Sequence, residues 1–159
     1  MPSFSITKVI TGQDLSDTIT LFEAYAVSLG IDLSFQDFAT EMAEMPGKYT
    51  APGGTLLLAR NNDVEAIGCV GLRQLEDGIC EMKRLYVDPK GRGTGVGKAL
   101  ALDAIEEGKK MGYSAMRLDT LPTMTSARGL YRALGFVEIP SYYDTPIKGT
   151  IFLELRLQP

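Results

Sequence analysis

Between residues 90 and 98 glycines alternate with other residues, three of which are cations, and this combination of residue types suits an anionic ligand. The segment reads KGRGTGVGK, with a glycine at every second position from 91 to 97. Glycines lack a Cβ, so successive backbone N–H groups can converge on one point. The apolar spacing that begins at Val96 predicts a helix, whose first-turn N–H groups are unpaired donors at its positive end. The expected guest of such a loop is a phosphate or pyrophosphate.

Two common phosphate-binding patterns do not fit this loop. The Walker pattern requires a glycine five residues before the last glycine, and Ser or Thr after the lysine. Arg92 stands five residues before Gly97, and Ala99 follows Lys98. The dinucleotide pattern Gly-x-Gly-x-x-Gly also fails, because its last position falls on Val96 or on Lys98. The pattern that remains is Arg-x-x-Gly-x-Gly, after a predicted strand and at the start of a predicted helix.

A second pattern lies further along the chain, in residues 127–136, which read ARGLYRALGF. It predicts a helix that contains Tyr131 and ends at Gly135, a residue suited to the left-handed cap of a helix. Together the two segments resemble the GNAT superfamily of acetyl-CoA-dependent N-acetyltransferases. The first is similar to that family's pyrophosphate motif, Gln/Arg-x-x-Gly-x-Gly/Ala, and the second to its helix ending in Leu-Tyr-x-x-x-Gly-Phe. The resemblance covers about residues 55 to 139.

This resemblance implies an acyltransferase that moves an acetyl group from acetyl-CoA to a primary amine by direct attack in a ternary complex. The loop amides would bind the pyrophosphate, and the pantetheine arm would lie along the strand that ends at Val87. The Leu85 N–H would polarise the thioester carbonyl. The implied cofactor-binding residues are Leu85, Tyr86, Val87, Arg92, Gly93, Thr94, Gly95, Val96, Gly97 and Lys98.

Two residues are candidates for proton transfer. Tyr131 is the expected general acid, because a phenol can donate its proton to the departing thiolate; otherwise it is a core tyrosine of an amphipathic helix. Glu81 is the candidate general base, since it stands eleven residues before Arg92, where some family members carry a catalytic glutamate. Its alternative is a surface glutamate or an ion-pair partner of Lys83 or Arg73.

The sequence departs from the family pattern at Met124. The family often has an asparagine there, seven residues before the tyrosine, which contacts the pantetheine arm. Thr123, Thr125 or Ser126 could supply a hydrogen bond in its place.

The acceptor groove is expected between segments 29–35 and 140–148, which wall it in the family. The second segment contains Ser141-Tyr142-Tyr143-Asp144. These residues could cradle a cation, but a surface turn capped by Asp144 before Pro146 is the favoured interpretation. The net charge of −4 suits a cationic acceptor.

The elements that must position these residues follow from apolar periodicity. Strands are predicted at 3–10, 55–60, 65–74, 79–87, 115–119, 136–139 and 150–157. Helices are predicted at 14–29, 34–45, 96–111 and 125–134, with Asp14 as N-cap of the first and a capping box from Ser34 to Asp37. The order predicts one domain over 1–159 of the α/β (α+β) class, with a mixed sheet and helices on both faces. The GNAT resemblance implies a three-layer fold with a mostly antiparallel sheet.

Composition excludes several classes of function. The 159 residues include no histidine, so no imidazole base or His-ligated metal is possible, and two cysteines cannot form a four-ligand zinc site. We therefore expect no metal. Net negative charge argues against a nucleic-acid partner. Without an apolar run of membrane length or a signal-peptide pattern, we expect no membrane partner and a cytoplasmic location.

The remaining expectations concern the cysteines, a possible homodimer and two alternative functions. A turn at 76–78 would set Cys80 opposite about Arg73, so Cys69 and Cys80 are expected to be buried free thiols. The exposed edge of the last strand could pair two subunits in a homodimer. Two other functions stay open: a CoA-binding sensor or regulatory module without turnover, and a domain that binds another nucleotide.

Overall fold

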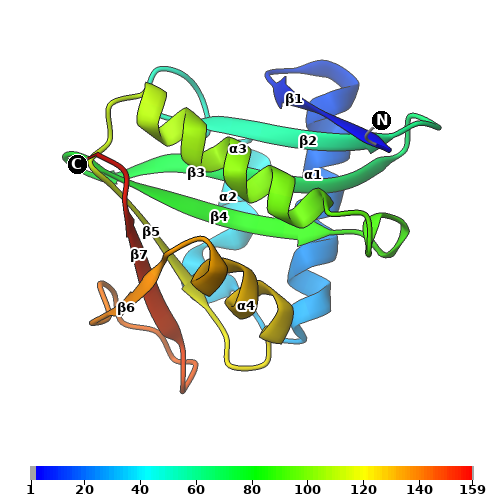
Figure 1. Cartoon of the computed structure of the whole chain (residues 1–159). Coiled ribbons are helices and arrows are strands. Elements are labelled where there is room, and N and C mark those ends of the chain that lie inside the picture. The colour runs from blue at the N-terminus through cyan, green and yellow to red at the C-terminus, as the bar shows by residue number, and fades with distance from the viewer. Residues whose placement is uncertain (1–2, 159) are drawn as a thin grey trace.

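The sheet is the central element of the structure, a computed structural model that describes residues 3–158. Within these residues seven strands follow the order β1-β2-β3-β4-β5-β7-β6 (Figure 1). All neighbouring strands are antiparallel except β4 and β5, which are parallel. This confirms the mixed, mostly antiparallel sheet. The elements are β1 Phe4–Val9, α1 Gly12–Leu29, η1 Ser34–Gln36, α2 Phe38–Ala43, β2 Thr55–Asn61, β3 Ala66–Glu76, β4 Ile79–Val87, η2 Pro89–Gly91, α3 Val96–Lys110, β5 Ala115–Thr120, α4 Thr125–Ala133, β6 Val137–Ile139 and β7 Ile151–Arg156.

Helices cover both faces of the sheet and give the three predicted layers. Helices α3 and α4 pack on one face, in a core that contains Leu100 and Tyr131, and α1 and α2 pack on the other, around Phe22 (Figure 1). The four-residue spacing of α3 points its buried residues at the sheet, as predicted. At Gly108 a Cβ would lie 3.1 Å from a Leu157 methyl carbon, so glycine permits the close approach of α3 and the sheet. The predicted α/β fold class is confirmed.

The starts of the first two helices differ from the prediction. Helix α1 begins at Gly12 with Thr11 as its N-cap, because the Asp14 carboxylate accepts a hydrogen bond of 2.6 Å from Arg60 instead of capping. The segment predicted as one helix from 34 to 45 is divided into η1 and α2 by Asp37, whose φ is +56°. No capping box forms, because the Asp32 carboxylate receives the Ser34 N–H.

A β-bulge interrupts the pairing of β4 with β3. Lys83 pairs with Gly71 and Tyr86 with Cys69, so the two residues between them oppose only Val70. Arg84, the first of the two, has φ +61°. A bulge of this kind turns a side chain away from the regular alternation of the strand. As a result, the adjacent Lys83 and Arg84 side chains reach the same neighbouring segment.

Two smaller expectations have different outcomes. Cys69 and Cys80 are buried free thiols, as predicted, although Cys80 lies opposite Gln74 and not Arg73. The last strand is not an edge, because β7 pairs with β5 on one side and β6 on the other. The reason given for a homodimer is therefore wrong, because this edge is already occupied. No helix among residues 3–158 has the length and apolar character needed to cross a membrane.

Candidate active site

Strands β4 and β5 separate soon after they meet, and this separation organises the site. Their parallel pairing covers only Ile79 to Glu81, opposite Ala115 to Arg117. Among residues 3–158, the rest of β4 has no partner strand on that side. The Asp88 N–H donates to Ile67 of β3, and N–H directions alternate along an extended strand. The N–H groups of Leu85 and Val87 therefore face the gap, as the Leu85 prediction requires.

The loop between β4 and α3 supplies a cluster of unpaired N–H groups. Gly93 and Gly95 have φ of +78° and +85°, a conformation that favours glycine. The backbone N–H groups of Gly93 and of residues 95–98 donate to no acceptor among residues 3–158. Those of 95–98 belong to the start of α3, where the helix dipole favours an anion. This is the geometry expected of a pyrophosphate site.

A groove, here the outer groove, leads from this loop to the gap between the strands. Its walls include Leu85, Tyr86, Val87, Arg92, Gly97 and Leu130. Residues 123–126 also line it, so the three hydroxyl side chains proposed to replace the missing asparagine are at hand. Val96 does not line the groove with its side chain, which is 1% exposed and belongs to the core. Of its groups, Val96 can therefore offer only the backbone N–H to a ligand in the groove.

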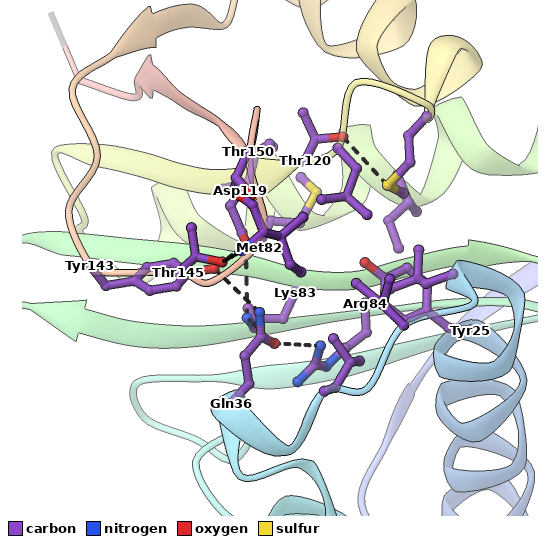
Figure 2. A pocket seen from close by; sticks show the side chains of 18 of the residues that line it. Tyr25, Gln36, Met82, Lys83, Arg84, Asp119, Thr120, Tyr143, Thr145 and Thr150 are labelled. Atoms are coloured by element: carbon purple, nitrogen blue, oxygen red, sulfur yellow. Dashed lines mark hydrogen bonds and ion pairs between the residues drawn. The ribbon is translucent and has the colours of Figure 1, made fainter.

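A second cavity, here the inner pocket, continues beyond the outer groove (Figure 2). Its wall includes Tyr25, Gln36, Lys83, Asp119, Tyr131 and Tyr143. Both segments expected to wall an acceptor groove contribute, the first through Leu29, Ile31 and Leu33 and the second through Tyr143, Thr145 and Ile147. Tyr25, Leu29, Leu85 and Met124 line both cavities, so the two meet at the separation of the strands.

Tyr131 projects from α4 into the inner pocket, where it is 6% exposed. Its hydroxyl makes no hydrogen bond with any other residue of the described chain, 3–158. Its ring packs edge-on against Phe136, with centroids 5.7 Å apart. Burial raises the pKa of Tyr131, so the phenol stays protonated at neutral pH. It is thus both a packed core residue and an available proton donor.

Glu81 lies close to the inner pocket but not in its wall. Its side chain is 2% exposed, and both carboxylate oxygens are engaged. Arg73 Nη2 lies 3.0 Å from Oε1, and the Tyr142 hydroxyl donates to Oε2 at 2.7 Å. This ion pair with Arg73 is one of the two roles that the sequence offered for Glu81 in place of general base. Its role as a base stays a prediction.

The sequence did not single out the polar ring that lines the inner pocket (Figure 2). Lys83 Nζ and Arg84 Nη1 both donate to Gln36 Oε1, at 3.3 and 2.8 Å. Gln36 Nε2 lies 3.3 Å from the Tyr143 hydroxyl, which donates to Asp119. Asp119 Oδ1 is 4.0 Å from Lys83 Nζ, and closes the ring. The two adjacent cations of β4, Lys83 and Arg84, were the one sequence signal for this ring.

The structure also corrects the prediction for the segment Tyr142-Tyr143. A surface turn was the favoured interpretation, but both tyrosines point inward and anchor the loop to carboxylates of β4 and β5. Their rings pack edge-on against Phe152, with centroids 5.0 and 5.2 Å away. Asp144 remains exposed. The loop after β6 is therefore a fixed wall of the pocket.

Comparisons with known proteins bear on the family and the fold of this chain. The model of the acetyltransferase (GNAT) family matches residues 20–136. An uncharacterized N-acetyltransferase of Schizosaccharomyces pombe is 40% identical over 156 residues, covering 98% of this chain and 96% of its own. A GNAT-family acetyltransferase structure from Staphylococcus aureus has a TM-score of 0.80 at 23% identity, covering 98% of this chain and 99% of its own. The yncA protein of Salmonella typhimurium, solved with its cofactor acetyl-CoA, has a TM-score of 0.67 at 18% identity, covering 98% of this chain and 95% of its own. This chain belongs to the GNAT acetyltransferase family.

Proposed function

We propose that this protein transfers an acetyl group from acetyl-CoA to a primary amine, by direct attack while both substrates are bound. The observation that carries this proposal is the junction of the two cavities at Tyr25, Leu29, Leu85 and Met124. A donor in the outer groove and an acceptor in the inner pocket would meet there. The neighbouring fold that was solved with acetyl-CoA supports the identity of the donor.

The residues of the site divide the chemistry among them. The N–H groups of Gly93 and of residues 95–98 bind the pyrophosphate, and the Leu85 N–H donates to the carbonyl oxygen as negative charge develops on it. The amine nitrogen forms a bond to the carbonyl carbon, and the bond from that carbon to sulfur breaks. Tyr131 gives its proton to the departing thiolate, and the second proton that the nitrogen loses as the amide forms returns to the Tyr131 phenolate, directly or through water. A carboxylate at the inner pocket receives the proton of the acceptor ammonium, directly or through water.

The test is thiol release from acetyl-CoA in the presence of a panel of primary amines. Amine-dependent release of one thiol per acetylated amine is the expected result, with mass spectrometry identifying the product. A shift of the melting temperature by CoA alone, without release for any amine, would instead support a silent CoA-binding module. No binding of CoA at all would overturn the proposal.

A further inference from the structure

We propose that the acceptor is an amino acid with a neutral side chain, whose carboxylate lies between Lys83 and Arg84 and whose amine lies at Asp119. This inference rests on the proposed function, because it assigns the acceptor of the same site. It comes from the polar ring of the inner pocket (Figure 2).

The first argument is the position that Gln36 Oε1 occupies. A neutral amide oxygen there accepts hydrogen bonds from two cationic side chains, Lys83 and Arg84. A carboxylate oxygen would complement these donors better, because charge-assisted hydrogen bonds are about twice as strong as neutral ones. The bulge in β4 aims both cations at this point. Gln36 belongs to the short turn η1 and is half-buried, so its side chain can withdraw toward solvent.

The second argument is the incomplete neutralisation of Lys83. It is 6% exposed, yet its Nζ has only the amide oxygen at 3.3 Å and Asp119 at 4.0 Å. Burial lowers the pKa of Lys83, although the nearby carboxylates of Glu81 and Asp119 oppose the shift. An anionic group of the acceptor would supply the missing partner.

The third argument is the balance of charge around the pocket. Arg84 is paired with Glu41 at 3.0 Å, and Arg73 with Glu81 at 3.0 Å. Among the described residues that line the pocket this leaves one loosely paired cation, Lys83, and one loosely paired carboxylate, Asp119. One cation and one anion match the carboxylate and the ammonium of a zwitterion. They leave no partner for a second charge on the acceptor.

The rest of the wall of the inner pocket determines which side chain the acceptor can carry. Apart from the ring, no described residue of the wall carries a charge. The pocket therefore offers no charge partner for an acidic or basic side chain of the acceptor. An acceptor with a net positive charge, which the net charge of the chain suggested, is not favoured.

The experiment measures thiol release from acetyl-CoA with the twenty amino acids. The best substrate is then compared with its methyl ester and its decarboxylated amine. We expect a neutral amino acid to be best, with the ester and the amine about 10- to 100-fold lower in kcat/KM, the range of one charge-assisted hydrogen bond. Equal use of acid, ester and amine would overturn the inference. Release with none of these compounds, but with another primary amine of the panel, would also overturn the inference and leave the proposed function intact.

Two variants test the position of the carboxylate. Lys83→Met is expected to lower kcat/KM for the amino acid about 10- to 100-fold, mainly through KM, and to leave the decarboxylated amine within about threefold. Gln36→Glu places a carboxylate between the two cations, so it is expected to raise KM for the amino acid about 10-fold or more, with unchanged CoA affinity. Lys109→Met, on the exposed end of α3, is the matched control. Equal losses for amino acid and amine in both variants would overturn the assignment.

Discussion

Tyr131 reaches the inner pocket with a hydroxyl that no other described side chain engages. We expect Tyr131→Phe to lower kcat about 100-fold or more, since this is the usual contribution of one positioned proton donor. Affinity for CoA should not change, because the ring still packs against Phe136. Stopped-flow thiol release and a CoA titration measure the two quantities. Tyr113→Phe is the control, since its hydroxyl bonds to Gly53 outside both cavities. An unchanged kcat in Tyr131→Phe would show that Tyr131 is not the general acid.

Two carboxylates compete for the role of proton acceptor. Asp119 lines the inner pocket, whereas Glu81 lies outside the wall with both oxygens engaged. We expect Asp119→Asn to lower kcat/KM about 100-fold or more. Glu81→Gln should instead lower stability, because it leaves the charge of Arg73 unpaired. Kinetics with the best amine and urea denaturation separate the two effects. A larger kinetic loss in Glu81→Gln would restore the glutamate as the base.

The burial of Lys83 also predicts that the stability of the protein depends on pH. Burial lowers the pKa of Lys83 from its usual value of 10.5. Between the lowered pKa and 10.5 the unfolded chain binds more protons than the folded protein, so this residue makes stability rise with pH. Relative to Lys83→Met, the free energy of unfolding of the wild type should therefore increase from neutral pH toward about 10.5. Urea titrations of both proteins across this range give the difference. A difference independent of pH would show that burial costs the ammonium nothing.

At the scale of elements, the start of α3 combines two roles in one glycine. Gly95 is the N-cap of the helix with φ +85°, and open space surrounds the position of its missing Cβ. Gly112 has φ +89° and equally open space at the other end of α3. We expect alanine at either position to cost about 1 kcal/mol of stability, the strain of a left-handed L-residue. Only Gly95→Ala should also weaken CoA, about 10-fold, because its methyl group would stand before the phosphate-binding amides. Equal CoA affinity of the two variants would exclude this loop as the phosphate site.

Sequence reasoning predicted local elements well and long-range contacts poorly. Strand β4 has the predicted bounds, and α3 begins at the predicted Val96, because the apolar spacing and the glycines of these segments act locally. The polar ring of the inner pocket could not be predicted in this way, because it depends on contacts between distant segments. A bulge at Arg84 turns two adjacent cations to one side, and Gln36 and Tyr143 come from segments more than 100 residues apart. Neither the bulge nor this contact leaves a periodic signal in the sequence.

At the scale of the whole molecule, the sheet consists of two parts joined by the short pairing of β4 and β5. The loop before α3 belongs to the part formed by β1 to β4, and α4 follows β5 in the other part (Figure 1). The outer groove takes its walls from both parts, through Arg92 and Leu85 on one side and Leu130 on the other. A ligand that fills the groove would therefore connect them.

This connection predicts where CoA protects the backbone. At 100 times its Kd, CoA should add about 2.7 kcal/mol of stability, equivalent to roughly 5–10 °C in Tm for a chain of this size. Hydrogen exchange should slow at the amides of Leu85 and Val87, which face the gap, and at 93–98. The amide of Asp88 is already bonded to β3, and serves as the internal control. ADP, which carries the pyrophosphate without the pantetheine arm, should protect only the loop. If CoA leaves the amides of Leu85 and Val87 unprotected while it protects the loop, the arm does not lie along β4, and the two parts of the sheet are not connected by the donor.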